Sequence, residues 1–348
     1  MFLIDFETLK NFINSLINQY EIYAPIKKRD EYIFEKISNA SEVVFENYIP
    51  TVLPPKKFLL PNEEKILKVN YKTKEAQPIF ESKEFIIFGV RPCDLTAIYI
   101  LDQIEADGNA DPYYLERRKN AIIIGYDCEK SCDENALCNT VGSINPPEKS
   151  YDIFISKMNN NYVLIASTEK GKELVKNHIT KKKNMDTSEI KEFNEKRAER
   201  ITKFNQNVKY VFQDVTKIFE KHYNDPYWDE IGKKCLMCGS CIMVCPTCYC
   251  FAVEHEIDLK LENVYVKRRW DGCLLRDFSL VAGGHNFRPT ASMRLKHRWN
   301  RKFNYLFKKY KISNCVGCGR CGRACLVNIN PIDILNNIMK NHYSEVKK

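Results

Sequence analysis

Short apolar runs alternate with helical patterns in the first half of the chain. Residues 84–90, EFIIFGV, form a continuous run rich in β-branched and aromatic residues, which predicts a buried strand. Residues 95–104, LTAIYILDQI, repeat apolar side chains every three or four positions, as one face of a helix does. A second run, AIIIGYDC at residues 121–128, predicts another buried strand. Strands that alternate with helices indicate a small α/β sheet.

Helical periodicity also marks three more polar segments. The opening residues 1–20 combine spaced apolar positions with acidic residues, which predicts an amphipathic helix. Between residues 171 and 225 the composition turns to Lys, Glu and Asn with helical spacing, which indicates a charged connector. Residues 292–310 carry charges and aromatic side chains at mixed spacing, as a half-buried or partner-facing helix would. We expect a domain boundary near Pro226.

Eight of the fifteen cysteines form two copies of one motif, C-x2-C-x2-C-x3-C. This is the bacterial ferredoxin run, in which three cysteines bind one 4Fe-4S cluster and the fourth binds the other cluster. The expected ligands are Cys235, Cys238, Cys241 and Cys325 for the first cluster, and Cys315, Cys318, Cys321 and Cys245 for the second. Pro246 follows the first copy, as the ferredoxin pattern requires, whereas Leu326 stands at the equivalent position of the second.

Structural zinc and disulfides are the alternative uses of these cysteines. Zinc sites usually pair two C-x2-C units, whereas a third cysteine after two residues and a fourth after three are typical of a cubane cluster. Asp5 and Glu7 in the opening segment argue against a secretory signal, so we expect a reducing cytoplasm, where thiols stay free to bind metal. Since no apolar stretch approaches the roughly 18 residues of a membrane span, we expect no membrane association.

The expected fold class is α+β. Residues 1–170 are predicted to form an N-terminal α/β domain, and residues 171–225 a charged helical connector. Residues 226–348 are predicted to form a bacterial-type dicluster ferredoxin domain with a basic helical insertion between the two motifs.

The net charge of +9 is concentrated between residues 267 and 311, which hold thirteen Lys or Arg against two Asp. With its interleaved aromatics, this segment could bind nucleic acid. Because it lies between two expected anionic clusters, we favour cluster shielding and partner docking instead, and expect no nucleic-acid partner. Arg268, Arg269 and Arg288 are expected to act on cluster potential or docking.

A second group of cysteines follows the predicted N-terminal strands. Cys93 and Cys128 each follow a strand, at the edge of the sheet where sites gather, and Cys132 and Cys138 lie in the next loop. Four thiolates at one edge could bind a third 4Fe-4S cluster, although buried cysteines are often inert.

Three further cysteines and a histidine lie between the motifs: Cys248, Cys250, Cys273 and His285. They could hold an additional metal site, since imidazole replaces thiolate in some iron–sulfur centres. Alternatively, they pack against the first cluster and tune it through hydrogen bonds.

Familiar substrate and nucleotide motifs are absent. The sequence contains no G-x-G-x-x-G after a strand, no Walker loop, no G-x-S-x-G and no H-E-x-x-H. We therefore expect no catalytic residues and no flavin or nicotinamide bound by this chain, with electrons entering and leaving through other proteins. The alternative is a stand-alone enzyme in which Cys248, Cys250 and Cys273 form a substrate-reactive cluster.

Seven segments carry a resemblance to a known family that spans about Tyr48 to Asp333. They are YIPTVLPPKKF, IIFGVRPCDL, ADPYYLERRKNAIIIGYDC, CLMCGSCIMVCPTCYCF, RRWDGC, VAGGHNFRPT and CVGCGRC. The chain resembles the beta subunits of cytosolic nickel–iron sulfhydrogenases. It resembles less closely the iron–sulfur subunit of anaerobic sulfite reductases, which is from the same dicluster ferredoxin-type family. LPPKKF and AGGHNFRPT favour the hydrogenase beta subunit.

The resemblance implies an iron–sulfur protein that relays electrons from or to a flavin- and NAD(P)-binding subunit. Its other partners would be the hydrogenase small and large subunits, or a sirohaem subunit in the sulfite reductase alternative. The resemblance also favours the third cluster. In that family the cysteine loop after the second strand usually ends C-x-C; Cys138 matches its last position, whereas Cys132 is displaced.

Overall fold

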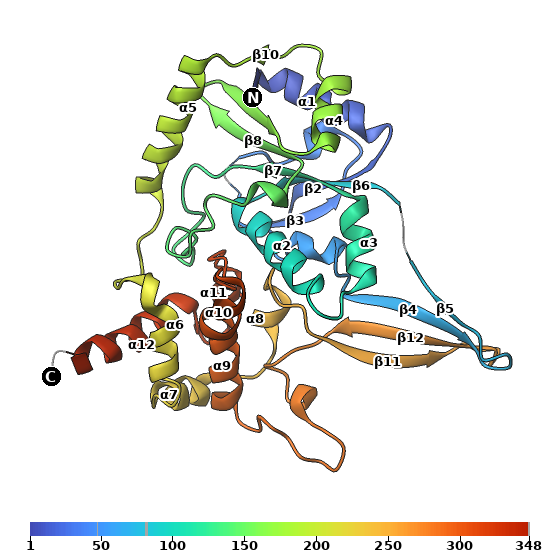
Figure 1. Ribbon diagram of the computed structural model, residues 1–348, viewed down its shortest axis with the longest axis vertical. Coiled ribbons are helices and arrows are strands. Elements are labelled where there is room, and N and C mark those ends of the chain that lie inside the picture. Colours follow the sequence, from blue (N-terminus) through green and yellow to red (C-terminus); the bar gives the residue numbers. More distant parts are fainter. Residues whose placement is uncertain (47, 81–82, 347–348) are drawn as a thin grey trace.

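An eight-stranded mixed sheet forms the core of the N-terminal half (Figure 1). The computed structural model describes residues 1–46, 48–80 and 83–346. In the order β10-β1-β9-β8-β7-β6-β2-β3, the strands are Lys183–Asn184, Phe2–Ile4, Asn161–Ala166, Ile153–Met158, Ala121–Tyr126, Phe85–Val90, Glu21–Lys28 and Glu31–Lys36. Strands β2, β6, β7 and β8 run parallel, and the remaining pairs are antiparallel.

Helices cover both faces of this sheet. Helices α1 (Phe6–Ile17) and α4 (Glu169–His178) pack on one face, and α2 (Pro92–Glu105) and α3 (Pro112–Asn120) pack on the other. Alternate residues of β7 therefore enter opposite cores, Ile122 and Ile124 in one and Ile123 in the other. A parallel strand buried on both faces reads as a continuous apolar run, which explains the pattern of residues 121–126.

The predicted strand, helix and second strand are confirmed as β6, α2 and β7. The prediction of one opening helix was partly wrong, since residues 2–4 form strand β1 before α1 begins. Asp5 separates the two elements, because its side chain accepts a hydrogen bond from Thr8 N at 2.7 Å and caps the helix.

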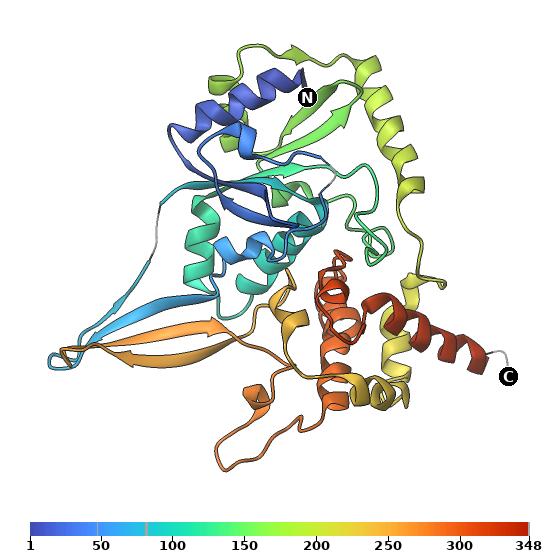
Figure 2. The same ribbon diagram turned by 180° about the vertical axis from the view of Figure 1, so that it is seen from behind.

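A four-stranded antiparallel sheet projects from the body in both views (Figures 1 and 2). Its order is β11-β12-β4-β5, with bounds Phe251–Ile257, Asn263–Trp270, Glu63–Asn70 and Ala76–Pro78. The central pair joins segments about two hundred residues apart, since Arg268 lies opposite Glu64. The predicted ranges 1–170 and 226–348 therefore share one sheet.

Helices form most of the remaining chain. The predicted connector contains α4, α5 (Thr187–Glu199) and α6 (Val215–Lys221), interrupted by the short strand β10. The C-terminal part contains α7 (Tyr227–Lys234), α8 (Ser240–Met243), α9 (Ala291–Asn300), a π-helical segment (Arg301–Tyr305), α10 (Leu306–Tyr310), α11 (Arg320–Arg323) and α12 (Pro331–Val346). Helices α6, α7, α9 and α12 share one apolar core. Within the described residues, no helix is long and apolar enough to span a membrane.

Candidate functional site

The two cysteine motifs fold into similar loops, each of which leads into a short helix. Gly239 precedes α8 with φ 78°, and Gly319 precedes α11 with φ 73°. Met237 and Gly317, two residues earlier in each copy, also have positive φ values of 53° and 65°. These left-handed positions turn the chain tightly between successive cysteines, which lets one short loop present three thiols to a common centre.

Each loop contributes to two neighbouring cavities. The first cavity is lined by Cys235, Cys238, Cys241 and Cys325, and the second by Cys245, Cys315, Cys318 and Cys321. Each set thus contains three cysteines of one motif and the last cysteine of the other. These are the two groups that the ferredoxin spacing predicts.

The thiols are spread around the cavities and do not converge on a point. Among residues 1–46, 48–80 and 83–346, no three His, Cys, Asp or Glu side chains are placed to hold one metal ion. A zinc ion would need four ligand atoms within about 2.3 Å of one centre. A cubane is larger and takes one thiolate at each of its irons, so the open arrangement fits a cluster better than it fits zinc.

The long helix that contains α9 carries three buried cations, of which Arg298 and Lys302 line the cysteine cavities. Arg294, Arg298 and Lys302 follow one another at four-residue spacing and are 0%, 2% and 3% exposed. Arg298 Nη2 donates to Cys241 O at 3.0 Å, and Lys302 Nζ donates to Thr247 Oγ1 at 2.5 Å. Part of the basic segment at residues 267–311 is therefore buried inside the protein.

Two hydrogen-bond donors at the cavities lack a protein acceptor. Arg298 and Trp299 line both cysteine cavities, and within the described part of the chain Arg298 Nε and Trp299 Nε1 have no partner. Buried donors are normally satisfied. A bound cluster would provide anionic sulfides as acceptors, so the cavities fit the group that the cysteine spacing implies.

The pKa values reflect the same arrangement. Burial alone would lower the pKa of Arg298, but the surrounding thiols, Cys241 and Cys321 first, raise it well above its usual value. Burial also raises the pKa of the Cys318 thiol to about 11, although Arg320 opposes the rise. Since metal binding requires thiolates, a cluster and these cations would stabilise the same ionised form.

The basic residues singled out from the sequence lie elsewhere. Arg268 is buried in ion pairs with Glu64 and Asp111, and Arg269 pairs with Glu254. None of Arg268, Arg269 and Arg288 lines a cavity that contains cysteines of the C-terminal half. The charges beside the cysteines belong to Arg298 and Lys302, which four-residue helical spacing could have identified.

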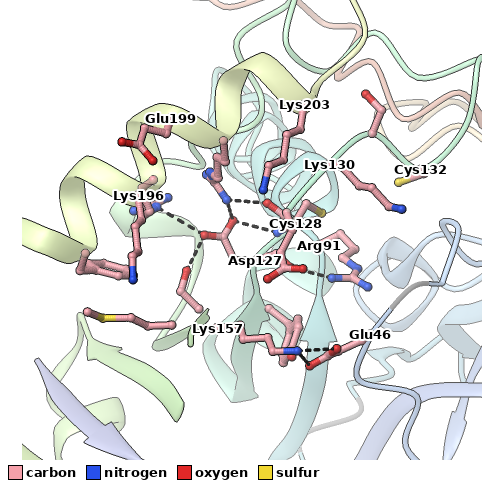
Figure 3. A pocket seen from close by; sticks show the side chains of 18 of the residues that line it. Glu46, Arg91, Asp127, Cys128, Lys130, Cys132, Lys157, Lys196, Glu199 and Lys203 are labelled. Carbon is pink, nitrogen blue, oxygen red and sulfur yellow. Dashed lines mark hydrogen bonds and ion pairs between the residues drawn. The ribbon is translucent and has the colours of Figure 1, made fainter. Parts of the chain in front are cut away.

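The N-terminal cysteines meet at the carboxyl edge of the parallel strands. Cys128, Cys132, Arg91 and Asp127 line an open cavity, and Figure 3 shows Cys128 next to Asp127 with Cys132 farther away. Asp127 pairs with Arg200, which anchors the middle of the connector here. Arg91 is buried and its Nη1 donates to Asp127 O at 2.7 Å.

Cys93 and Cys138 lie near this cavity without lining it. Cys93, in the first turn of α2, packs in a small apolar cluster with Val316 and Cys318. The loop carrying Cys138 docks against the second motif, where Leu137 N donates to Gly317 O at 2.9 Å. Cys132 is close enough to each of the other three thiols to influence its pKa. The structure thus brings them to one edge, but not around one cavity.

The additional candidate residues are separated. Cys248, Cys250 and Cys273 line a third cavity beside the first two. His285 lies on an exposed loop, where its ring is 4.8 Å from that of Phe287, and does not line this cavity.

Comparisons with known proteins agree with this geometry. The family described as "4Fe-4S dicluster domain" matches residues 234–329, a range that contains both motifs. Sulfhydrogenase 2 subunit beta of Pyrococcus furiosus is 33% identical over 338 residues, which cover 95% of this chain and 96% of that protein. The chain therefore belongs to the family of sulfhydrogenase beta subunits and is an iron–sulfur protein.

Proposed function

We propose that this chain is the electron-transfer subunit of a cytoplasmic nickel–iron hydrogenase complex. In this role it relays electrons between the hydrogenase small and large subunits and a partner that binds flavin and NAD(P). The observation that carries the proposal is the pair of adjacent four-cysteine cavities with Arg298 and Trp299 in the wall of both. Adjacent centres support one-electron transfer along a chain of clusters.

The cysteines that line each cavity are the proposed ligands. Cys235, Cys238, Cys241 and Cys325 would hold the first 4Fe-4S cluster, and Cys315, Cys318, Cys321 and Cys245 the second. Such clusters supply one-electron oxidation and reduction when bound. The chain contributes burial, hydrogen-bond donors and positive charge, which set the potential at which an electron is accepted.

A third 4Fe-4S cluster is proposed at Cys93, Cys128, Cys132 and Cys138. Its support is that Cys132 lies close enough to Cys93, Cys128 and Cys138 to influence their pKa values, and that the buried Arg91 lines the same cavity as Cys128 and Cys132. A cluster here would extend the relay from the second ferredoxin site towards the open cavity. The two cysteines outside that cavity would have to turn towards it on cluster binding.

The relative named as a sulfhydrogenase subunit supports the hydrogenase complex over the sulfite reductase alternative. We propose that the partner subunits bind flavin, nicotinamide and the catalytic metal, and that this chain has no catalytic residue of its own. Turnover of substrate by the isolated chain would contradict this division of roles.

Cys238→Ser and Cys318→Ser, made in the assembled complex, test the relay. Each variant should lose NAD(P)H-linked hydrogenase activity but keep activity with artificial dyes that react directly at the catalytic subunit, because only the relay is interrupted. Complex assembly, measured by size-exclusion chromatography, is the control. Equal loss of both activities in an intact complex would contradict the proposal, and sulfite-linked activity would identify the alternative partner.

A further inference from the structure

The third cavity is built where the projecting sheet meets the ferredoxin loops. Phe251 and Trp270 lie opposite each other at the ends of β11 and β12. This pairing brings Cys250, just before β11, close to Cys273, just after β12, and Asp271 N donates to Cys250 O at 3.1 Å. With Cys248, these cysteines line a cavity that is similar in size to the second ferredoxin cavity.

Three buried cations and the half-buried Arg301 lie around this cavity. Arg298, Arg301 and Lys302 line it, and Lys56 Nζ donates to Cys248 O at 2.5 Å. Lys56 is 3% exposed and comes from the 3-10 helix Pro55–Phe58, far from the cysteines in sequence. In the described parts of the chain, none of these four cations forms an ion pair with a carboxylate. Because buried charge needs a counter-charge, the cavity is suited to an anionic group.

Arg298 also has an unsatisfied hydrogen-bond donor beside this cavity. It is only 2% exposed, lines all three cavities, and its Nε has no partner within the described residues. The third cavity also adjoins the second, since Thr247, Arg298 and Lys302 line both. Arg298 and Lys302 also serve the ferredoxin cavities. Of the three cavities, however, Arg301 lines the third alone and Lys56 is bonded to Cys248, so packing of three inert cysteines does not account for these two cations.

We propose that Cys248, Cys250 and Cys273 bind a further iron–sulfur cluster, with Asp271 at its fourth iron. The proposal rests on the iron–sulfur role proposed above and adds a site to it. Asp271 is the acidic residue in the wall of the cavity, and a carboxylate is a known type of iron ligand. With this site, all fifteen cysteines of the chain belong to a proposed cluster.

The test is the iron and acid-labile sulfide content of Cys250→Ser and Cys273→Ser in the anaerobically purified complex. Each variant should contain about four fewer irons and four fewer sulfides per chain than the wild type. Cys132→Ser distinguishes this site from the N-terminal one. Adding Cys250→Ser to Cys132→Ser should remove as much iron as Cys250→Ser removes from the wild type. His285→Ala is the control and should retain the wild-type iron content.

Wild-type iron and sulfide in folded Cys250→Ser and Cys273→Ser would overturn the inference while leaving the ferredoxin sites intact. Loss of four irons in His285→Ala would overturn the assignment of Asp271. If the serine variants do not fold, Asp271→Cys decides, since a fourth thiolate should shift the EPR spectrum of one cluster at unchanged iron content. An unchanged spectrum would contradict the proposal. A wild-type chain without iron would instead refute the proposed function itself.

Discussion

Arg298 links the proposed centres. Its side chain is buried among thiols of both ferredoxin sites and of the third cavity, and one nitrogen is bonded to Cys241 O. Such a cation favours thiolates and reduced clusters alike, because both carry added negative charge.

Replacing Arg298 by Leu should lower the midpoint potentials of the neighbouring clusters. Removing one charge about 6 Å away at an effective dielectric constant near 20 amounts to roughly 100 mV. Arg298→Lys keeps the charge and should shift the potentials much less. EPR-monitored redox titration measures both, and equal potentials in the wild type and Arg298→Leu would refute this role.

Glu105, at the end of α2, is predicted to make stability depend on pH. Burial and the neighbouring Asp111 raise its pKa to about 7, while Arg268 opposes the shift. The folded state therefore binds more protons than the unfolded state, so stability falls as pH rises from about 4.5 to about 7 and then levels off.

Glu105→Gln should remove this dependence. It should raise the unfolding free energy at pH 8 by about 1 kcal/mol after solvent screening is allowed for, and change it little near pH 4.5. Thermal unfolding of both proteins across this pH range measures the difference. A stabilisation that is the same at both pH values would argue against a raised pKa.

The long helix from α9 to α10 places neighbouring side chains in two different environments. Trp299 and Phe303 stack with ring centroids 5.8 Å apart and are buried in the core shared with α6, α7 and α12. Arg298 and Lys302, one position earlier in each case, face the cysteines. Aromatic residues that could have stacked on nucleic-acid bases thus serve packing, and the adjacent cations serve the sites.

The contact between the Cys138 loop and the second motif depends on Gly317. Its φ is 65°, and an added Cβ would collide with the backbone of Leu137 and Cys138. Gly317→Ala should therefore reduce stability by several kcal/mol and impair iron incorporation at the second site.

Gly142→Ala is the matched control, because Gly142 has φ 80° but open space around its Cα. It should cost only the strain of the left-handed backbone, about 1 kcal/mol. Chemical unfolding and iron analysis of both variants make the comparison. Equal effects would mean that the loop contact does not matter.

Across the whole molecule, features that depend on residues close together in the sequence were predictable, and features that join distant segments were not. The parallel strands and α2 were predictable because burial on both sheet faces gives local apolar runs. The two cysteine groups that line the ferredoxin cavities were predictable because three members of each lie within one seven-residue stretch, and the known crossed pattern supplies the fourth.

Features built from distant segments were not predictable. The projecting sheet pairs β4 with β12, and their charged sequences show no clear alternation; Arg268 is satisfied there by Glu64 and Asp111. Lys56 likewise reaches Cys248 across most of the chain. His285 looked equivalent to the nearby cysteines in sequence, but its loop carries it to the surface.

The most direct test of the account is the iron, zinc and acid-labile sulfide content of the anaerobically purified wild-type protein, with EPR after dithionite reduction. We predict at least about eight irons and eight sulfides per chain, with signals from interacting clusters, and more where the additional sites are filled. Zinc without sulfide would contradict the account, because four-cysteine zinc sites could not relay electrons.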